Sequence, residues 1–254
     1  MRSVLYPINW CDSIEILPSN SFELKCEGLT IDAKPEKNLC TKAFRLLQEK
    51  YGLPNVAIRL IKSIPMGAGL GGGSADAVSV LRLCNEMFDL KLSIEELQNY
   101  AAELGSDCPF FVAKKAAWVC GRGTDITPLE LDLEEYSFLL VYPAVHISTA
   151  WAYQNVAFSK NEWDRTIISK PIVEWKDALT NDFEKAVFDH HPSLEEIKQT
   201  LYNEGAIYAS MSGSGSSFFG IFRDHRQAME LQNFFKTNDY LVKAIHPKYV
   251  GFKF

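Results

Sequence analysis

A glycine-rich turn carries the residues best suited to chemistry in this sequence. Its residues are Pro65, Met66, Gly67, Ala68, Gly69, Leu70, Gly71, Gly72, Gly73 and Ser74, and five of the seven residues from Gly67 to Gly73 are glycines. Glycine lacks a Cβ and adopts positive φ, so this backbone can approach a ligand closely. A helix that follows the turn offers unpaired N–H groups and a positive dipole end to an anion. We therefore expect a phosphate site, with the Ser74 hydroxyl on a phosphate or on its magnesium ion. A purely structural turn is the alternative.

The Walker loop, a common phosphate-binding motif, does not fit this turn. A Walker loop needs a lysine before the serine or threonine at the helix start, and Gly73-Ser74-Ala75 has none. The turn therefore has to bind phosphate without a lysine of its own.

The Rossmann pattern G-x-G-x-x-G does occur from Gly67 to Gly72, and Asp89 lies near the distance expected for a ribose-binding acid. The helix predicted after the turn runs almost to Asp89, however, which leaves no room for the second strand. Arg59 and Lys62 in the preceding strand also differ from the apolar run of a doubly buried parallel strand. We therefore expect an antiparallel sheet with one wet face.

The stretch from Pro65 to Ala77 closely resembles the ATP-binding signature of the GHMP kinases, the galactokinase, homoserine, mevalonate and phosphomevalonate kinase superfamily. The triple glycine followed by Ser-Ala-Asp-Ala is similar to one branch, the 4-diphosphocytidyl-2-C-methyl-D-erythritol kinases of the non-mevalonate isoprenoid pathway. The resemblance implies ATP and Mg²⁺ as cofactors, and it implies ATP-binding roles for the ten turn residues. It also places Asn38 near the nucleotide base, although an asparagine at a helix start is more often a cap.

Asp107 is the candidate catalytic residue. It lies in Gly105-Ser106-Asp107-Cys108-Pro109-Phe110-Phe111, just past a predicted helix and before an apolar run. A carboxylate held there can accept a hydrogen bond from a hydroxyl and orient it, with or without removing its proton. The segment resembles one in the same kinase branch whose aspartate faces the substrate hydroxyl. A turn aspartate without a catalytic role is the alternative.

Further segments are similar to the same branch. The resemblance implies substrate contacts for Ser148 and Thr149 on the diphosphate and cytidine side, although both could be simple N-caps. It places Phe183 near the cytosine, although a core aromatic is the safer interpretation. The loop Ser212, Gly213, Ser214 and Gly215 matches the third superfamily motif and is expected to approach the first glycine turn and support the phosphate site. The pair His190-His191 is interpreted as surface loop.

Composition excludes several other classes of function. The net charge of -6 gives no electrostatic case for binding nucleic acid or an anionic membrane surface. No apolar run has the length of a membrane span, and the N-terminus lacks a signal-peptide pattern. The six cysteines are scattered without a CxxC pair, so disulfides and metal sites are not expected. We expect a cytoplasmic protein with a small-molecule substrate, as a monomer or weak homodimer.

The periodicity of apolar residues predicts a mixture of strands and helices without strict alternation, which favours the α+β class. Helices are predicted over residues 39–51, 74–88, 93–105, 149–158, 173–179, 183–188, 194–204 and 226–236. Strands are predicted over residues 4–8, 13–17, 22–27, 56–64, 118–120, 137–142, 206–210, 217–222 and 240–245. Two helices carry Ser-x-x-Glu capping boxes, at Ser93 and at Ser193.

The N-terminus departs from the family pattern. Members usually begin with a strand bearing Ala-Lys-x-Asn and a turn with Gly-Tyr-His, whereas Met1–Pro7 matches the segment after them. The resemblance implies that the missing lysine lies near the transferred phosphate. Either the start codon is assigned too far downstream or the chain is truly short. We favour the first explanation, because losing a strand would expose a neighbouring edge.

Together these observations predict an α+β protein with a two-lobed GHMP kinase fold. The resemblance implies an N-terminal lobe like ribosomal protein S5 domain 2 over residues 1–142, truncated at its start, and a ferredoxin-like lobe over residues 143–254. It implies phosphorylation of the 2-hydroxyl of 4-diphosphocytidyl-2-C-methyl-D-erythritol in a site between the lobes. Another GHMP small-molecule kinase and a non-catalytic nucleotide-binding protein stay open as alternatives.

Overall fold

The chain divides into two units in a computed structural model that describes residues 2–31, 34–121, 123, 125–157, 165–238 and 240–246. Unit 1 comprises Met1–Met66 and Gly71–Glu130, and unit 2 comprises Gly67–Leu70 and Leu131–Phe254. Both units thus contribute to the glycine-rich turn: Gly67–Leu70 belong to unit 2, and its other residues belong to unit 1. None of the helices in the described part of the chain has the length and apolar character needed to cross a membrane.

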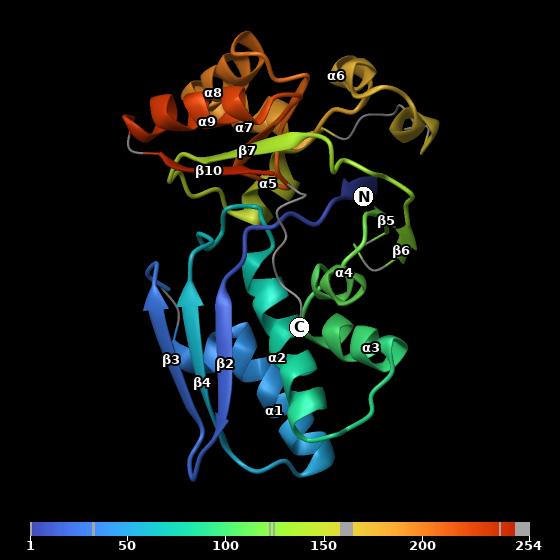
Figure 1. Cartoon of the computed structure of the whole chain (residues 1–254), viewed down its shortest axis with the longest axis vertical. Coiled ribbons are helices and arrows are strands. Elements are labelled where there is room, and N and C mark those ends of the chain that lie inside the picture. The colour runs from blue at the N-terminus through green and yellow to red at the C-terminus, as the bar shows by residue number, and fades with distance from the viewer. Residues whose placement is uncertain are drawn as a thin grey trace. The chain divides into compact units, whose positions relative to one another are not determined.

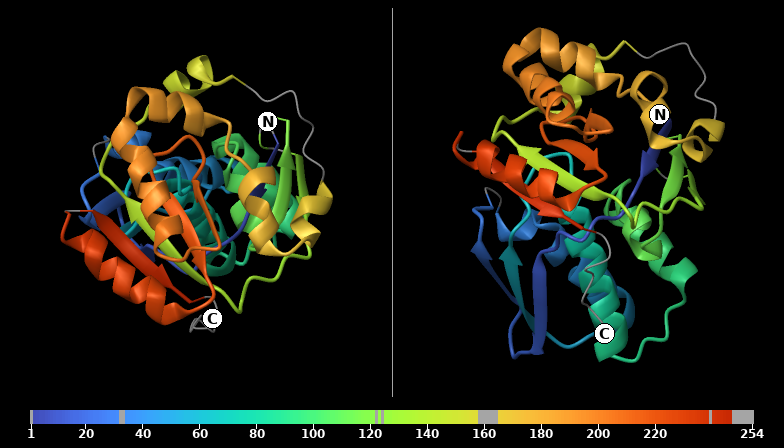
Figure 2. Two further views of the ribbon diagram at one scale, coloured as in Figure 1. Left: turned by 90° about the horizontal axis from the view of Figure 1, so that it is seen from above. Right: turned by 45° about the horizontal axis from the view of Figure 1, so that its top comes forward.

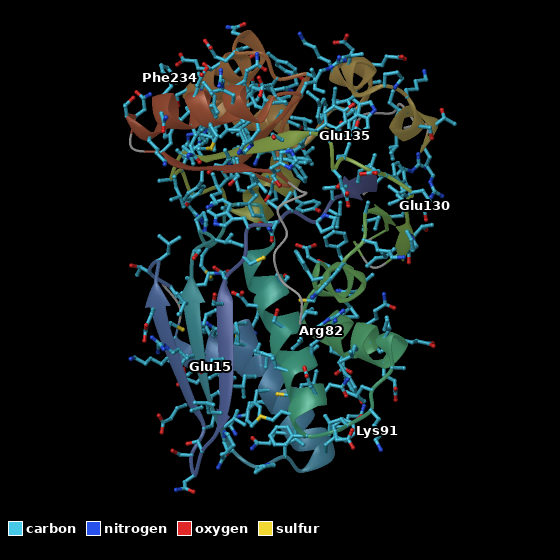
Figure 3. All side chains as sticks on the ribbon, viewed as in Figure 1. Glu15, Arg82, Lys91, Glu130, Glu135 and Phe234 are labelled. Carbon is cyan, nitrogen blue, oxygen red and sulfur yellow. The ribbon has the colours of Figure 1, made fainter. Side chains whose placement is uncertain are left out.

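Unit 1 is built on a three-stranded sheet in the order β2 (Ser13–Pro18), β4 (Val56–Lys62) and β3 (Glu23–Gly28). Strand β4 pairs antiparallel with β2 and parallel with β3, so the expected antiparallel sheet is only half correct. Buried and more exposed residues alternate along β4, and its buried apolar residues pack against α1 (Leu39–Tyr51) and α2 (Gly72–Met87). The two helices cover one face of the sheet (Figure 1), and Glu15 of β2 is exposed on the other (Figure 3).

The rest of unit 1 extends this core. Helix α3 (Ile94–Leu104) and the short α4 (Cys108–Ala113) pack beside α2, and the 3-10 turn η1 (Pro35–Lys37) precedes α1. Strands β1 (Arg2–Leu5), β5 (Ala117–Cys120) and β6 (Asp125–Pro128) form a second, antiparallel sheet in the order β1-β5-β6. Arg82 extends from α2 (Figure 3), and its guanidinium donates to the carbonyl of Val112 in α4.

Unit 2 contains an antiparallel sheet in the order β10 (Leu241–Ile245), β7 (Ser137–Tyr142), β9 (Phe218–Phe222) and β8 (Tyr208–Met211). Helices α8 (Pro192–Asn203) and α9 (His225–Lys236) pack on it (Figures 1 and 2). The remaining helical segments are α5 (Thr149–Asn155), η2 (Arg165–Ser169), η3 (Ile172–Glu174), α6 (Trp175–Ala178) and α7 (Phe183–His190). The domain border was predicted after Tyr142, the last residue of β7. Strand β7 pairs with β10 and β9, so it belongs to the sheet of unit 2.

Three local predictions need correction. The capping box at Ser93 is present, but the one predicted at Ser193 is not, because Pro192 already occupies the first turn of α8 and no side chain caps it. Lys62 was expected on the wet face of its strand, yet it is buried. Helix α5 ends at Asn155, and Phe158, the last residue of the predicted helix, lies outside the described residues.

Candidate functional site

The glycine-rich turn leads directly into α2. Gly67, Gly69 and Gly71 all have positive φ, and Gly71 is the N-cap of the helix in the left-handed conformation. A glycine N-cap has no side chain to bond the first amides, and α2 has no side-chain cap. The opening N–H groups of this helix are therefore left to other partners, as a phosphate site requires.

Several of these glycines are needed for packing within the protein. A Cβ on Gly69 would lie 2.2 Å from the Ser212 carbonyl oxygen, and one on Gly71 would lie 2.8 Å from the Phe111 ring. A Cβ on Gly72 would lie 3.0 Å from the Ile64 side chain. These contacts explain part of the glycine content without any ligand.

The structure brings the Ser212–Gly215 loop against the first half of the turn, within unit 2. The Ser212 hydroxyl donates to the Gly69 carbonyl at 2.8 Å, and the Ser217 N–H donates to the Ala68 carbonyl at 3.1 Å. Two segments some 140 residues apart in sequence are thereby joined by backbone contacts. A role of this loop in binding phosphate stays a prediction.

Asp107 lies at the N-terminus of α4 in unit 1. Its side chain is exposed and does not cap the helix, and its Oδ1 has the neighbouring Ser106 hydroxyl at 3.4 Å. Next to it, Cys108 is fully buried in the core of unit 1, and α4 packs against α2. The core therefore holds the start of α4, which carries Asp107.

A buried ion-pair network lies beneath the turn. The Lys62 ammonium, at the end of β4, binds Asp76 Oδ2 of α2 at 2.9 Å and also binds Asp12 Oδ2. The other oxygen of Asp12 accepts the N–H groups of Ser63 and Ile64 at 2.5 and 2.8 Å. Burial raises the pKa of Asp76 to about 7, although the Lys62 ammonium opposes the rise. These contacts fix the chain on both sides of the glycine-rich turn.

The remaining predicted site residues have local structural partners. Asn38 caps α1 through a bond from the Cys40 N–H at 2.9 Å, and Ser148 caps α5 through the Trp151 N–H at 3.4 Å. The Thr149 hydroxyl lies 3.3 Å from that of Ser214. The Phe183 side chain is buried, with the Tyr153 ring edge-on at 5.0 Å. Ligand contacts of these residues stay predictions.

Sequence reasoning missed the polar groups that hold the turn and the loop in place. The missed residues are Asp12, Lys62, Asp76, Asn181 and Glu184. One signal was available: Lys62 falls on the same strand face as the apolar Ile58 and Leu60, and an aspartate follows within the signature itself. Asn181 and Glu184 flank Phe183, which the resemblance had already singled out.

The fold and the glycine-rich turn define a class of protein: the chain belongs to the GHMP kinase family. Residues 38–115 match the GHMP kinases N terminal domain, and residues 166–240 match the GHMP kinases C terminal domain. The chain therefore has the GHMP kinase fold and is a small-molecule kinase.

Similar proteins point to one branch of this family. A protein of Azobacteroides pseudotrichonymphae, named 4-diphosphocytidyl-2-C-methyl-D-erythritol kinase, is 46% identical over 92% of this chain and 88% of its own length. A Bacteroides fragilis protein of the same name is 47% identical over 87% of this chain and 83% of its own.

Solved structures agree with this grouping. A crystal structure of 4-(cytidine 5'-diphospho)-2C-methyl-D-erythritol kinase has a TM-score of 0.83 at 27% identity, covering 96% of this chain and 88% of its own. The mevalonate kinase of Methanococcus jannaschii has a TM-score of 0.74 at 15% identity, covering 97% and 91%, and shows the shared fold.

Proposed function

We propose that this chain transfers the γ-phosphoryl group of ATP to the 2-hydroxyl of 4-diphosphocytidyl-2-C-methyl-D-erythritol. The observation that carries this proposal is the identity of 46–47%, over most of the chain, to relatives named for that kinase activity. The uncapped start of α2 after a left-handed glycine supports the phosphate-binding part of the proposal.

In this mechanism the amides of the glycine-rich turn and of the α2 N-terminus hold the ATP phosphates. Asn38, at the start of α1, lies toward the base, and Ser148, Thr149 and Phe183 contact the substrate. The loop from Ser212 to Gly215 supports the phosphate-binding turn through its contact with Gly69. The chain's own contribution is thus positioning and hydrogen bonding, which phosphoryl transfer mainly requires.

Asp107 orients the attacking hydroxyl. Its carboxylate is exposed at the start of α4, a helix that packs against α2 and buries the adjacent Cys108 in the core. A carboxylate in that place can accept a hydrogen bond from the substrate hydroxyl, and can take its proton as the new bond forms. Transfer of the phosphoryl group then leaves ADP and the phosphorylated alcohol.

A magnesium ion fits a site in which ATP supplies most of the ligands. Within the described ranges, no three His, Cys, Asp or Glu side chains gather as a metal site. Mg²⁺ in such sites is held by phosphates, water and one or two protein oxygens, and the Ser74 hydroxyl in the first turn of α2 is suited to that role. When bound, the ion neutralises charge on the β- and γ-phosphates.

A coupled phosphotransfer assay with purified full chain tests the proposal. We expect turnover with 4-diphosphocytidyl-2-C-methyl-D-erythritol and little with homoserine or mevalonate. Asp107→Asn should lower kcat at least about a hundredfold, whereas Asp89→Asn, a change on an exposed turn, should leave both kcat and the KM for ATP unchanged. Preference for another alcohol would refute the substrate, and ATP binding without transfer to any of them would refute the activity.

A further inference from the structure

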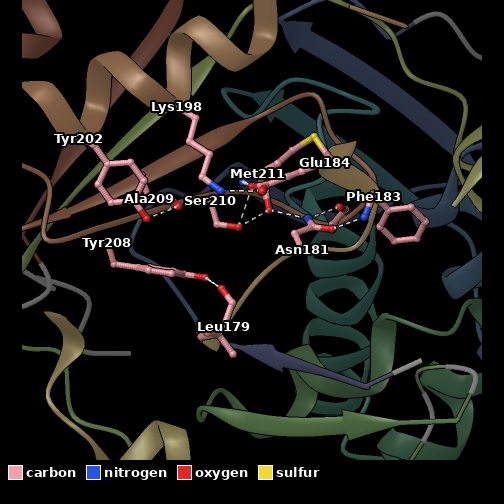
Figure 4. Close-up of polar contacts among 11 residues, drawn as sticks. Leu179, Asn181, Phe183, Glu184, Lys198, Tyr202, Tyr208, Ala209, Ser210 and Met211 are labelled. Carbon is pink, nitrogen blue, oxygen red and sulfur yellow. Dashed lines mark hydrogen bonds and ion pairs between the residues drawn. The ribbon is translucent and has the colours of Figure 1, made fainter. Parts of the chain in front are cut away.

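Glu184, near the start of α7, is a buried carboxylate held by three donors (Figure 4). Its Oε1 accepts the Met211 N–H at 2.8 Å and the Ser210 hydroxyl at 3.1 Å, and its Oε2 accepts the Lys198 ammonium at 2.6 Å. The residue is 7% exposed. A buried charge is tolerated only where it is paired and hydrogen-bonded, and Glu184 meets both conditions.

Asn181 holds the next residues of the same segment (Figure 4). Its Nδ2 donates to the carbonyls of Met211 and Gly213, both at 2.8 Å, while its Oδ1 accepts the Phe183 N–H at 2.9 Å. Between them, Asn181 and Glu184 bind the Met211 N–H, the Met211 carbonyl and the Gly213 carbonyl. The end of β8 and the start of the following loop are therefore fixed by side chains of one short segment.

The segment held in this way is the one that contacts the glycine-rich turn. Ser212, between Met211 and Gly213, donates its hydroxyl to the Gly69 carbonyl at 2.8 Å. A Cβ on Gly69 would lie 2.2 Å from the Ser212 carbonyl oxygen, so the two backbones touch and movement of one displaces the other. All of these residues belong to unit 2.

We propose that Asn181 and Glu184 are positioning residues for nucleotide binding. They fix the Met211–Gly213 segment, the segment fixes the turn at Gly69, and the turn is thereby held in the conformation that receives the ATP phosphates. The Lys198 ammonium lies 2.6 Å from Glu184 Oε2 and holds the carboxylate in place. The kinetic consequence rests on the proposed function, whereas the structural coupling does not.

The decisive variant is Asn181→Asp in the full chain. It keeps the size of the side chain and the bond from the Phe183 N–H, but it replaces the donor Nδ2 by an oxygen that faces two carbonyls. We expect the amides of residues 211–217 to exchange hydrogen at least about tenfold faster, and the Kd and KM for ATP to rise by roughly tenfold or more, with a smaller change in kcat. Glu184→Gln, which keeps an oxygen for the Met211 N–H, should shift the same quantities less than Glu184→Ala.

Tyr202→Phe is the matched control for a purely structural effect. The Tyr202 hydroxyl of α8 donates to the Ala209 carbonyl of β8 at 3.1 Å, outside both the segment of residues 181–184 and the loop (Figure 4). This variant should lower the melting temperature while leaving both the exchange of residues 211–217 and the affinity for ATP unchanged.

Two results would overturn the inference: unchanged exchange in residues 211–217 of Asn181→Asp, or faster exchange there with unchanged ATP affinity. A weaker ATP affinity of the same size in Tyr202→Phe would also overturn it. Hydrogen exchange and ATP binding by calorimetry need no turnover. Failure of the proposed substrate would therefore leave this test intact.

Discussion

Lys62 offers the sharpest test of how the glycine-rich turn is held. Replacing it by methionine keeps most of the side chain's volume but leaves the carboxylates of Asp12 and Asp76 buried without their shared cation. The lysine side chain is 1% exposed, so water cannot substitute for it. The variant therefore isolates the electrostatic contribution of the network.

The expected loss is large. Removing one partner of a buried ion pair costs about 3–5 kcal/mol, because the partner charge stays desolvated. At about 2–4 °C per kcal/mol for a protein of this size, Lys62→Met should lower Tm by roughly 6–20 °C. Because Asp76 can escape the penalty by binding a proton, the loss should be larger at pH 8 than at pH 6.

Thermal unfolding by circular dichroism at both pH values measures the effect, with Arg59→Met as the matched control. Arg59 lies three residues earlier on β4 and pairs with Glu27 at 2.8 Å, but both side chains reach water. Exposed pairs contribute little to stability, so this control should change Tm little at either pH. A loss in Lys62→Met no larger than in Arg59→Met, or one that is the same at both pH values, would refute the reasoning.

Three further outcomes are expected. The pKa of Asp76 is raised to about 7, so the folded state binds its proton more tightly than the unfolded state does. Asp76 should therefore reduce the free energy of unfolding by up to about 1.4 kcal/mol per pH unit as the pH rises from about 4 to 7, and no further above that. Asp76→Asn should remove this dependence, and Tm–pH curves of variant and parent that run parallel would contradict it. Gly69→Ala should lower Tm much more than Gly52→Ala does. Both glycines have positive φ, but only a Cβ on Gly69 would clash with the Ser212 carbonyl. Equal losses of Tm in the two variants would show that the loop around Ser212 moves to accommodate the Cβ. Gly73→Ala should leave Tm unchanged or raise it slightly, since its Cβ would meet nothing closer than 3.9 Å. The same variant should weaken ATP binding measured by calorimetry. An unchanged affinity for ATP would mean that the phosphates bind elsewhere.

Local sequence signals were sufficient where a helix end depends on its own residues. Helix α1 begins after Asn38 and ends before Gly52, and the bonds that cap it run within a few residues. The same Ser-x-x-Glu pattern succeeded at Ser93 and failed at Ser193. The difference is Pro192, which is suited to the first turn of a helix and shifts its start ahead of the serine.

Burial of the polar residues was beyond the reach of such signals. Lys62 follows Arg59 on one strand, and both were interpreted as solvent-facing, yet Lys62 is paired with Asp12, 50 residues earlier in the chain. Alternation along a strand shows which face a side chain takes. It does not show whether a distant carboxylate will neutralise a charge on the buried face. The short α4 was missed for a related reason, since six residues give too little periodicity to detect.

Backbone conformation and packing account for some glycines of the turn but not for all of them. Gly69 and Gly71 have positive φ and lie against other parts of the chain, so their replacement disturbs the folded protein with or without a nucleotide. Gly73 lies in α2, and a Cβ there would make only an ordinary van der Waals contact with the Leu39 side chain at 3.9 Å. A glycine that neither φ nor packing requires, in the first turn of an uncapped helix, is what the proposed close approach of a phosphate to the backbone would need. Gly73 therefore supports the proposed phosphate site more strongly than the number of glycines does.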